Sequence, residues 1–146
     1  MKVYLGCTVR GDRSALDVSR FLARRLGERG HEVLTTHLLH DDVDVVESSL
    51  SNEEVYRRDV AWLDACDFLV AEASGSTYGV GFEVGYITGC APRTGQKAFV
   101  LYRRERRDSV SRLVSGLAGA HVKVFPYEFF ADIDAALAEI DRAVAR

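Results

Sequence analysis

Prolines and cysteines are scarce in this chain of 146 residues, and each scarcity excludes a class of protein. Only two prolines occur, so no proline-rich linker divides the sequence, and its length fits one domain, residues 1–146. The three cysteines, Cys7, Cys66 and Cys90, are odd in number and far apart. This spacing argues against a disulfide framework and favours a reducing, cytoplasmic environment.

Long apolar runs and an excess of basic residues are also missing. No stretch approaches the roughly 20 apolar residues that span a bilayer, and no secretory signal pattern opens the sequence. The formal net charge is −3, from 19 Lys and Arg against 22 Asp and Glu, whereas nucleic-acid-binding proteins usually carry a basic face. We therefore expect neither a membrane nor a nucleic acid as partner.

The signatures of common metal and cofactor sites are absent as well. The four histidines show no H-E-x-x-H spacing and pair with no cysteine cluster, so we expect no metal site. Gly79 and Gly81 form a G-x-G, but the third glycine of the dinucleotide-binding fingerprint is lacking. Neither a G-x-x-x-x-G-K-[ST] loop nor a G-x-S-x-G elbow occurs, and we expect no cofactor.

Short apolar runs alternate with helical patterns along the chain. Strands are predicted at 2–7, 31–39, 68–71, 97–102 and 122–125, and helices at 16–26, 51–65, 82–89, 110–117 and 133–144. Such alternation is typical of βαβ units and predicts an α/β fold with a parallel sheet between helix layers. The turns after the first and third strands should then line one crevice. The acidic segment 40–50 lacks clear periodicity and is predicted to be a mobile loop.

The segment from Ser76 to Gly85, with the sequence STYGVGFEVG, has the composition of an anion-binding turn. Its glycines let backbone N–H groups approach an anion, and the start of a helix adds the positive end of its dipole. Glu83 is predicted in or near the first helical turn, where the dipole favours the ionised form. An ionised carboxylate in a crevice can stabilise or attack an oxocarbenium-like sugar centre. An ordinary surface glutamate explains the pattern equally well.

Asp59 and the turn that begins at Thr8 are the other candidates for chemistry. Asp59 falls in the predicted helix 51–65, where a solvated surface position is the usual interpretation. Thr8 and Arg10 could hold a phosphate, because the planar guanidinium donates hydrogen bonds in pairs, or they could simply shape a turn.

Three segments together resemble those of the 2'-deoxynucleoside 5'-monophosphate N-glycosidases, within the nucleoside 2-deoxyribosyltransferase superfamily. They are residues 3–11, 58–63 and 70–85, in that order, and residues 108–111 and 115–116 also fit. The resemblance implies a flavodoxin-like (Rossmann-like) three-layer α/β/α fold with five parallel strands. It also implies a homodimer whose active site lies close to the subunit interface. The implied reaction is hydrolysis of the N-glycosidic bond of (deoxy)nucleoside 5'-monophosphates, releasing the free base and (deoxy)ribose 5-phosphate.

The same resemblance implies roles for individual residues. Glu83 corresponds to the catalytic carboxylate, Asp59 to a second acid beside it, and Tyr4 to a hydroxyl that positions the carboxylate and the sugar. The implied phosphate and substrate contacts are Thr8, Val9, Arg10, Gly11, Thr77, Gly79, and Ser111 from the partner subunit.

Three positions depart from the family pattern. Gly6-Cys7-Thr8 stands where Cys-Gly-Ser is usual, which puts a side chain where the backbone normally comes close. Thr77 replaces a serine, and Tyr78 replaces an aliphatic residue. Two other functions stay open: a nucleoside 2-deoxyribosyltransferase that exchanges bases, and a non-catalytic nucleotide-binding module on the same fold.

Overall fold

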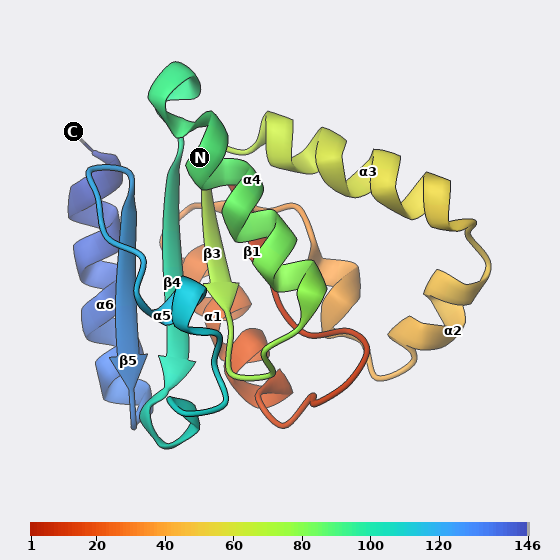
Figure 1. Ribbon diagram of the computed structural model, residues 1–146, viewed down its shortest axis with the longest axis horizontal. Coiled ribbons are helices and arrows are strands. Elements are labelled where there is room, and N and C mark those ends of the chain that lie inside the picture. Colours follow the sequence, from red (N-terminus) through yellow and green to blue (C-terminus); the bar gives the residue numbers. More distant parts are fainter. Residues whose placement is uncertain (146) are drawn as a thin grey trace.

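The computed structural model describes residues 1–145, with the exception of the side chain of residue 44. Its centre is a five-stranded sheet with parallel neighbours in the order β2-β1-β3-β4-β5 (Figure 1). The strands are β1 (Lys2–Gly6), β2 (Glu32–Val33), β3 (Phe68–Glu72), β4 (Lys97–Arg103) and β5 (Val122–Tyr127). The strand order reverses between β1 and β3, which is where sheets of this type bind ligands. The predicted α/β fold with five parallel strands is confirmed.

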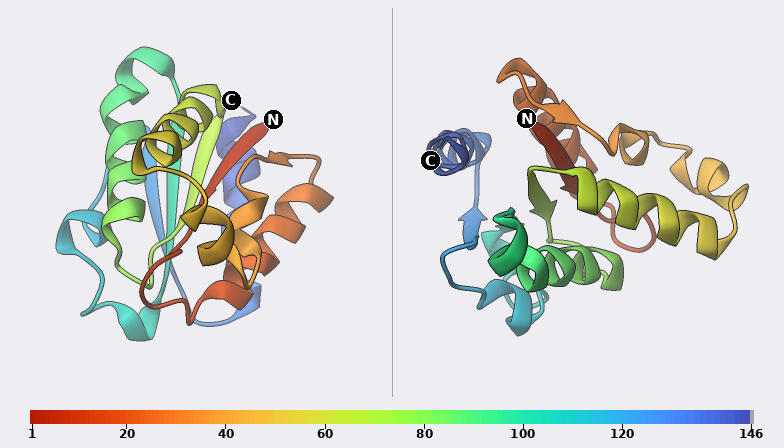
Figure 2. Two further views of the ribbon diagram at one scale, coloured as in Figure 1. Left: turned by 90° about the vertical axis from the view of Figure 1, so that its right-hand side faces the viewer. Right: turned by 90° about the horizontal axis from the view of Figure 1, so that it is seen from above.

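Helices cover both faces of the sheet (Figure 2). On one face lie α1 (Leu16–Glu28) and α6 (Phe130–Val144), and on the other lie α3 (Asn52–Ala65), α4 (Tyr78–Thr94) and α5 (Arg112–Ser115). The remaining helical segments are α2 (Val43–Ser48), η1 (Thr36–Leu39) and η2 (Arg104–Arg106). Within residues 1–145, none of these helices combines the length and the apolar composition needed to cross a bilayer.

The central strands are buried on both sides, which explains their almost uninterrupted apolar sequence. In β1, Val3 and Leu5 pack into the core beneath α1 and α6, whereas Tyr4 packs into the core beneath α3 and α4. Side chains alternate in this way because successive residues of a strand point to opposite faces. The alternation puts the Tyr4 side chain on the face that α4 covers.

Two predictions for residues 31–50 are wrong. The strand expected at 31–39 is limited to Glu32–Val33, and the chain then turns into η1. Thr35 explains the early end, because its Oγ1 accepts a hydrogen bond from the Leu5 N–H at 3.1 Å and donates one to the Leu5 carbonyl at 2.7 Å. The segment 40–50, expected to be a mobile loop, contains α2, which the fully buried Val43 anchors.

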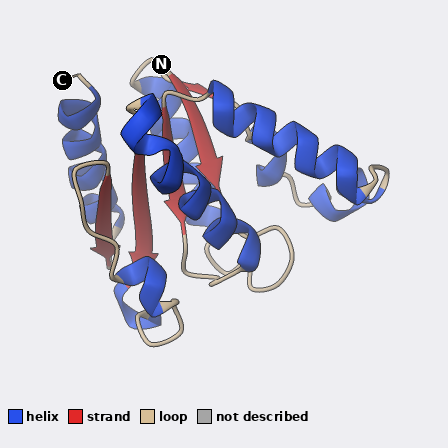
Figure 3. Ribbon diagram, turned by 45° about the horizontal axis from the view of Figure 1, so that its top comes forward, coloured by secondary structure: helices blue, strands red, loops and turns tan. Residues whose placement is uncertain are grey.

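The start of α3 agrees with its sequence signal. Ser51 Oγ accepts from the Glu54 N–H at 3.2 Å, and Glu54 Oε2 accepts from the Ser51 N–H at 2.8 Å, which forms a capping box. The capped end of α3 extends beyond the edge of the sheet, and α2 lies next to it (Figures 1 and 3). Together, α2 and α3 form a wall beside the turn that follows β1.

Candidate active site

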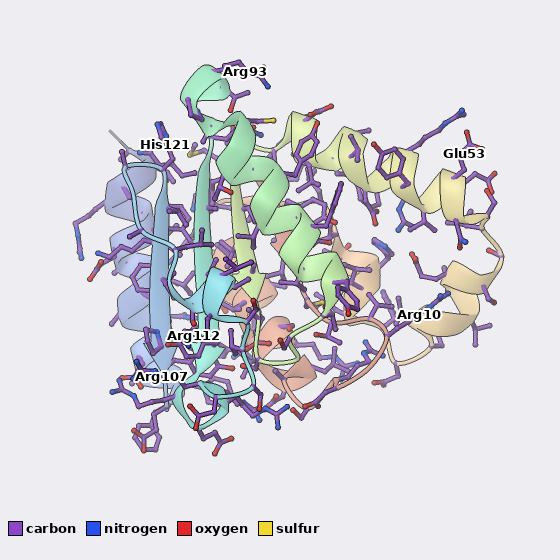
Figure 4. The ribbon with its side chains drawn as sticks, in the orientation of Figure 1. Arg10, Glu53, Arg93, Arg107, Arg112 and His121 are labelled. Atoms are coloured by element: carbon purple, nitrogen blue, oxygen red, sulfur yellow. The ribbon has the colours of Figure 1, made fainter. Side chains whose placement is uncertain are left out.

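A pocket of about 620 Å³ lies at the switch point of the sheet. The turns after β1 and β3 both line it, as the sequence predicted, together with the first turns of α4 and the wall formed by α2 and α3. Of the predicted site residues, those that line the pocket are Val9, Arg10, Gly11, Asp59, Thr77, Gly79 and Glu83. The Arg10 side chain is exposed and extends from the β1 turn in the direction of α2 (Figure 4).

Glu83 is held at the base of this pocket by Tyr4. The Tyr4 hydroxyl donates a hydrogen bond to Glu83 Oε1 at 2.8 Å, between residues that lie 79 positions apart in the sequence. Tyr4 is fully buried, and burial together with the adjacent Glu83 raises its pKa above the usual range, so the phenol keeps its proton and donates. The other carboxylate oxygen, Oε2, is buried and has no hydrogen-bond partner among the described residues.

Gly6 makes room for this carboxylate. A Cβ atom added at Gly6 would lie 2.4 Å from Glu83 Oε2, closer than any real contact allows. In this chain the bare backbone at Gly6 therefore leaves space for the carboxylate at the end of β1. The next residue, Cys7, contributes a buried side chain to the pocket, and burial raises the pKa of its thiol to about 11.

Burial of Glu83 acts against the ionised form that the helix dipole was expected to favour. Helix α4 begins at Tyr78, so Glu83 lies in the second turn rather than the first. Burial raises the pKa of Glu83 to about 8, the Tyr4 hydrogen bond opposes the shift, and the neighbouring charge of Asp59 adds to it. Burial therefore favours the protonated carboxyl in the free protein.

The turn after β3 has the geometry of an anion site. Ser76 adopts a φ of 50°, a strained conformation for a residue other than glycine, and such strain often accompanies function. Thr77 is the N-cap of α4 and makes no side-chain capping bond, so its hydroxyl is free for a ligand. The first N–H groups of a helix lack partners within that helix and favour an anion.

Thr8 occupies a different place from the one expected. It is buried and does not line the pocket in the described chain, where it packs between the two turns. A Cβ atom at Gly75 would lie 2.2 Å from Thr8 Oγ1, so only a glycine lets the turns approach this closely. The Thr8 hydroxyl has no hydrogen-bond partner among residues 1–145. A phosphate contact by Thr8 stays a prediction.

Asp59 faces the pocket from the inner side of α3. Its Oδ1 accepts from Arg58 Nε at 2.8 Å, and its side chain is 27% exposed. It is thus a paired residue at a pocket wall and not the freely solvated one that its sequence position favours. Its charge reaches both Tyr4 and Glu83, because it contributes to the raised pKa of each.

One side of the pocket was not predicted from the sequence. Leu38, Glu47, Leu50, Asn52 and Val55 line it from η1, α2 and the start of α3. Most of these residues lie in the segment that was expected to be a strand or a mobile loop. The acidic composition of residues 40–50 hid the fact that Glu47 points inward.

Ser111 lies outside this pocket in the single chain. It is exposed, at the N-cap of α5, and does not line the pocket. Its assignment depends on a partner subunit and stays a prediction.

A larger pocket, of about 810 Å³, lies on the other face of the sheet between α1, α6 and the ends of β4 and β5. Its walls include Tyr127, Phe129 and Phe130, without the glycine turns or the paired Glu83 and Asp59. We place the site in the smaller pocket because the candidate chemical groups converge there.

Comparison with known proteins shows the family of this chain. The family model for nucleoside 2-deoxyribosyltransferase matches residues 3–128, which include both carboxylates and both turns. The chain belongs to this family. A relative from Thermofilum pendens, provisionally named 2'-deoxynucleoside 5'-phosphate N-hydrolase 1, is 40% identical over 97% of this chain and 93% of its own.

A second relative and one solved structure are more distant. The 5-hydroxymethyl-dUMP N-hydrolase of Esox lucius is 30% identical, over 80% of this chain and 79% of its own. The solved structure of a CMP N-glycosidase from Clostridium botulinum matches with a TM-score of 0.66 at 17% identity, over 96% of this chain and 99% of that one. This last match shows that the fold is shared.

The raised pKa of Glu83 predicts that folding weakens as the pH rises. Glu83 titrates near 4.5 when unfolded and near 8 when folded, so between these values the folded chain keeps a proton that the unfolded chain has lost. Each rise in pH across this window favours unfolding. Glu83→Gln cannot titrate and should lose less stability than the wild type between about pH 5 and pH 8. Urea unfolding at both pH values measures the free energy of unfolding of each protein. An equal loss of stability in the wild type and in Glu83→Gln would contradict the raised pKa of Glu83.

Proposed function

We propose that this chain is a hydrolase that cuts the N-glycosidic bond of (deoxy)nucleoside 5'-monophosphates, producing free base and (deoxy)ribose 5-phosphate. The observation that carries the proposal is the Tyr4–Glu83 hydrogen bond at the base of a pocket whose rim is an anion-binding turn. The N-hydrolase names of the relatives from Thermofilum pendens and Esox lucius support the same reaction.

The pocket has separate places for the phosphate and for the sugar. The phosphate would lie against the start of α4, where Thr77 and Gly79 line the pocket and free N–H groups point outward. Arg10 and Gly11, on the facing turn, would close around it, and Gly11 permits this bend with a φ of 110°. A phosphate held there places the sugar above Glu83.

The two carboxyl groups then have different tasks. In an N-glycosidic cleavage the bond between the anomeric carbon and the base nitrogen breaks, and positive charge develops on the sugar. Once ionised, Glu83 faces that charge from below while water supplies the hydroxyl group of the product. Asp59, at the wall of the pocket, would handle the proton that passes to the base or from the water.

Base exchange is the alternative reaction, because the matching family is named for transferases. The anion-binding turn favours a phosphorylated substrate, whereas transfer uses unphosphorylated nucleosides. Incubation with a deoxynucleoside, a deoxynucleotide and a second free base separates the two reactions, since only a transferase produces a new nucleoside.

Glu83→Gln should abolish release of the base while preserving the fold. The amide can still accept from Tyr4 but cannot carry the negative charge that the transition state requires, so we expect a loss of roughly a thousandfold or more. Chromatography of free base from a panel of deoxynucleoside monophosphates measures the rate. Glu53→Gln, on the exposed outer end of α3, is the matched control (Figure 4). Turnover by Glu83→Gln at the wild-type rate would refute the proposal.

Gly6→Ala should impair the same reaction by displacing Glu83. The added methyl group would collide with Oε2, so the carboxylate must leave its position below the sugar. Overpacking of this kind costs about 1–3 kcal/mol of stability, and turnover should fall further than stability. Gly27→Ala is the control, because a Cβ there meets open space. Equal kinetic constants for the two variants would show that the clearance at Gly6 is unimportant.

We also propose that the protein acts as a cytoplasmic homodimer. Its cysteines are free, as a reducing compartment favours. The side chains of Tyr56 and Phe82 are exposed on neighbouring helices, and their ring centroids lie 6.3 Å apart. Such exposed aromatic groups often mark an interface. Gly81 and Gly85 on α4 leave open space beside them, which would let a second helix approach closely.

A shared site predicts complementation between two inactive variants. Glu83→Ala removes the catalytic group, and Ser111→Asp should repel the phosphate from the partner's site. In mixed dimers one site keeps Glu83 and faces an unaltered Ser111, so mixing should restore about a quarter of the wild-type activity. No recovery after the subunits exchange would show that Ser111 does not act across the interface.

A further inference from the structure

Arg58 precedes Asp59 on α3 and contacts it, although Arg58 itself is not among the described residues that line the pocket. Arg58 Nε donates a hydrogen bond to Asp59 Oδ1 at 2.8 Å. Consecutive residues of a helix do not face each other, so a pair of this kind does not form from helix geometry alone. The contact therefore depends on whatever else holds the Arg58 side chain in place.

Two further contacts hold the guanidinium of Arg58. Its Nη1 forms an ion pair with Glu47 Oε1, on α2, at 2.8 Å. Its central carbon lies 5.0 Å from the centre of the Trp62 ring, one turn further along α3. The side chain of Arg58 is only 21% exposed and that of Glu47 only 9%, so solvent screens their attraction little. An arginine fixed at both places presents Nε to Asp59 in one orientation.

The orientation matters because the two oxygens of Asp59 have different surroundings. Oδ1 is bound to Arg58, whereas Oδ2 makes no hydrogen bond to the residues that the structure describes. Asp59 lines the pocket and its side chain is 27% exposed, so this second oxygen is available to a base or to a water molecule. Proton transfer needs heavy atoms about 2.6–3.2 Å apart. A carboxylate that rotates freely would meet this condition only part of the time.

We propose that Arg58 is a positioning residue that fixes the Asp59 carboxylate in the orientation that proton transfer requires. This inference rests on the proposed hydrolysis and on the task that Asp59 has in it. Arg58 acts through Asp59, because Arg58 does not line the pocket itself in the described chain. Lysine cannot replace it, since one ammonium group cannot contact Glu47 and Asp59 as the guanidinium does through Nη1 and Nε.

Arg58→Lys should lower turnover without weakening substrate binding. The variant keeps a positive charge beside Glu47, so we expect it to fold, but it loses the second point of contact. Misplacing a reacting group by about 1 Å costs up to roughly a hundredfold, so kcat should fall by about tenfold to a hundredfold while KM stays close to the wild-type value. Release of free base from a deoxynucleoside monophosphate that the wild type cleaves measures both constants.

Arg57→Lys is the matched control for Arg58→Lys. Arg57 also pairs with a glutamate, Glu53, but its side chain is 75% exposed on the outer end of α3. This variant should keep the kcat and the KM of the wild type. A loss of kcat as large as that of Arg58→Lys would show that any arginine of α3 has the same effect, and would overturn the proposal.

A double-mutant cycle separates the positioning of Asp59 from a merely structural role. In Asp59→Asn the group that Arg58 positions is gone, so adding Arg58→Lys should lower kcat no further. A structural role predicts the same fold-loss of kcat in both backgrounds. That result, or an effect of Arg58→Lys on KM alone, would overturn the positioning role and leave hydrolysis intact. A wild type that cleaves no deoxynucleoside monophosphate would overturn the proposed function and the positioning role with it.

The contact can also be measured without turnover. The Nε–H proton of Arg58 should exchange with water more slowly in the wild type than in Asp59→Asn, because a hydrogen bond to a charged oxygen is stronger than one to an amide. Nitrogen NMR on protein labelled at arginine measures this exchange. Equal exchange rates would overturn the positioning role even if Asp59→Asn has no measurable activity.

Discussion

The hydrogen bond from Tyr4 to Glu83 joins the first strand to the helix that follows the third strand, and the site depends on it. Parallel pairing places β1 beside β3, so a side chain of β1 and the second turn of α4 meet at the switch point. Because Gly6 offers no side chain, the carboxylate can lie over the end of the strand. The fold thereby supplies a buried acid whose orientation is fixed before any substrate arrives.

Burial also determines the electrostatics of this acid. Removing the Glu83 carboxyl from water favours its neutral form, and the nearby charge of Asp59 acts in the same direction. Such a carboxyl loses its proton more readily when positive charge forms beside it, which is what breakage of an N-glycosidic bond produces. Burial therefore makes ionisation of Glu83 costly in the free protein. The same burial strengthens the attraction between the ionised carboxylate and the positive charge of the transition state.

Much of the fold followed from the sequence because local patterns agree with tertiary packing. The strands β1, β3 and β4 were predicted correctly from their apolar runs, and the start of α3 was predicted from the capping box at Ser51. Segment 31–50 did not, since the side chain of Thr35 replaces strand pairing and α2 is anchored mainly by Val43. Patterns of hydrophobicity carry no information about either effect.

The site was only partly accessible to the same reasoning. The resemblance pointed to Glu83 and Asp59, but the ionisation of Glu83 depends on burial, which no sequence pattern reveals. Glu47 was missed because its inward direction depends on Arg58, which lies 11 positions further along the chain. Contacts of this kind arise from tertiary packing, and a structure is needed to find them.

The titration of the Glu83 side-chain carboxyl, followed by carbon NMR on protein labelled at glutamate, tests the central claim most directly. The structure predicts a pKa of about 8 in the free protein. The value should rise further in Tyr4→Phe, because the hydrogen bond that favours the ionised form is lost. A carboxyl that titrates near 4.5, the ordinary value for glutamate, and does not respond to Tyr4→Phe would contradict the account.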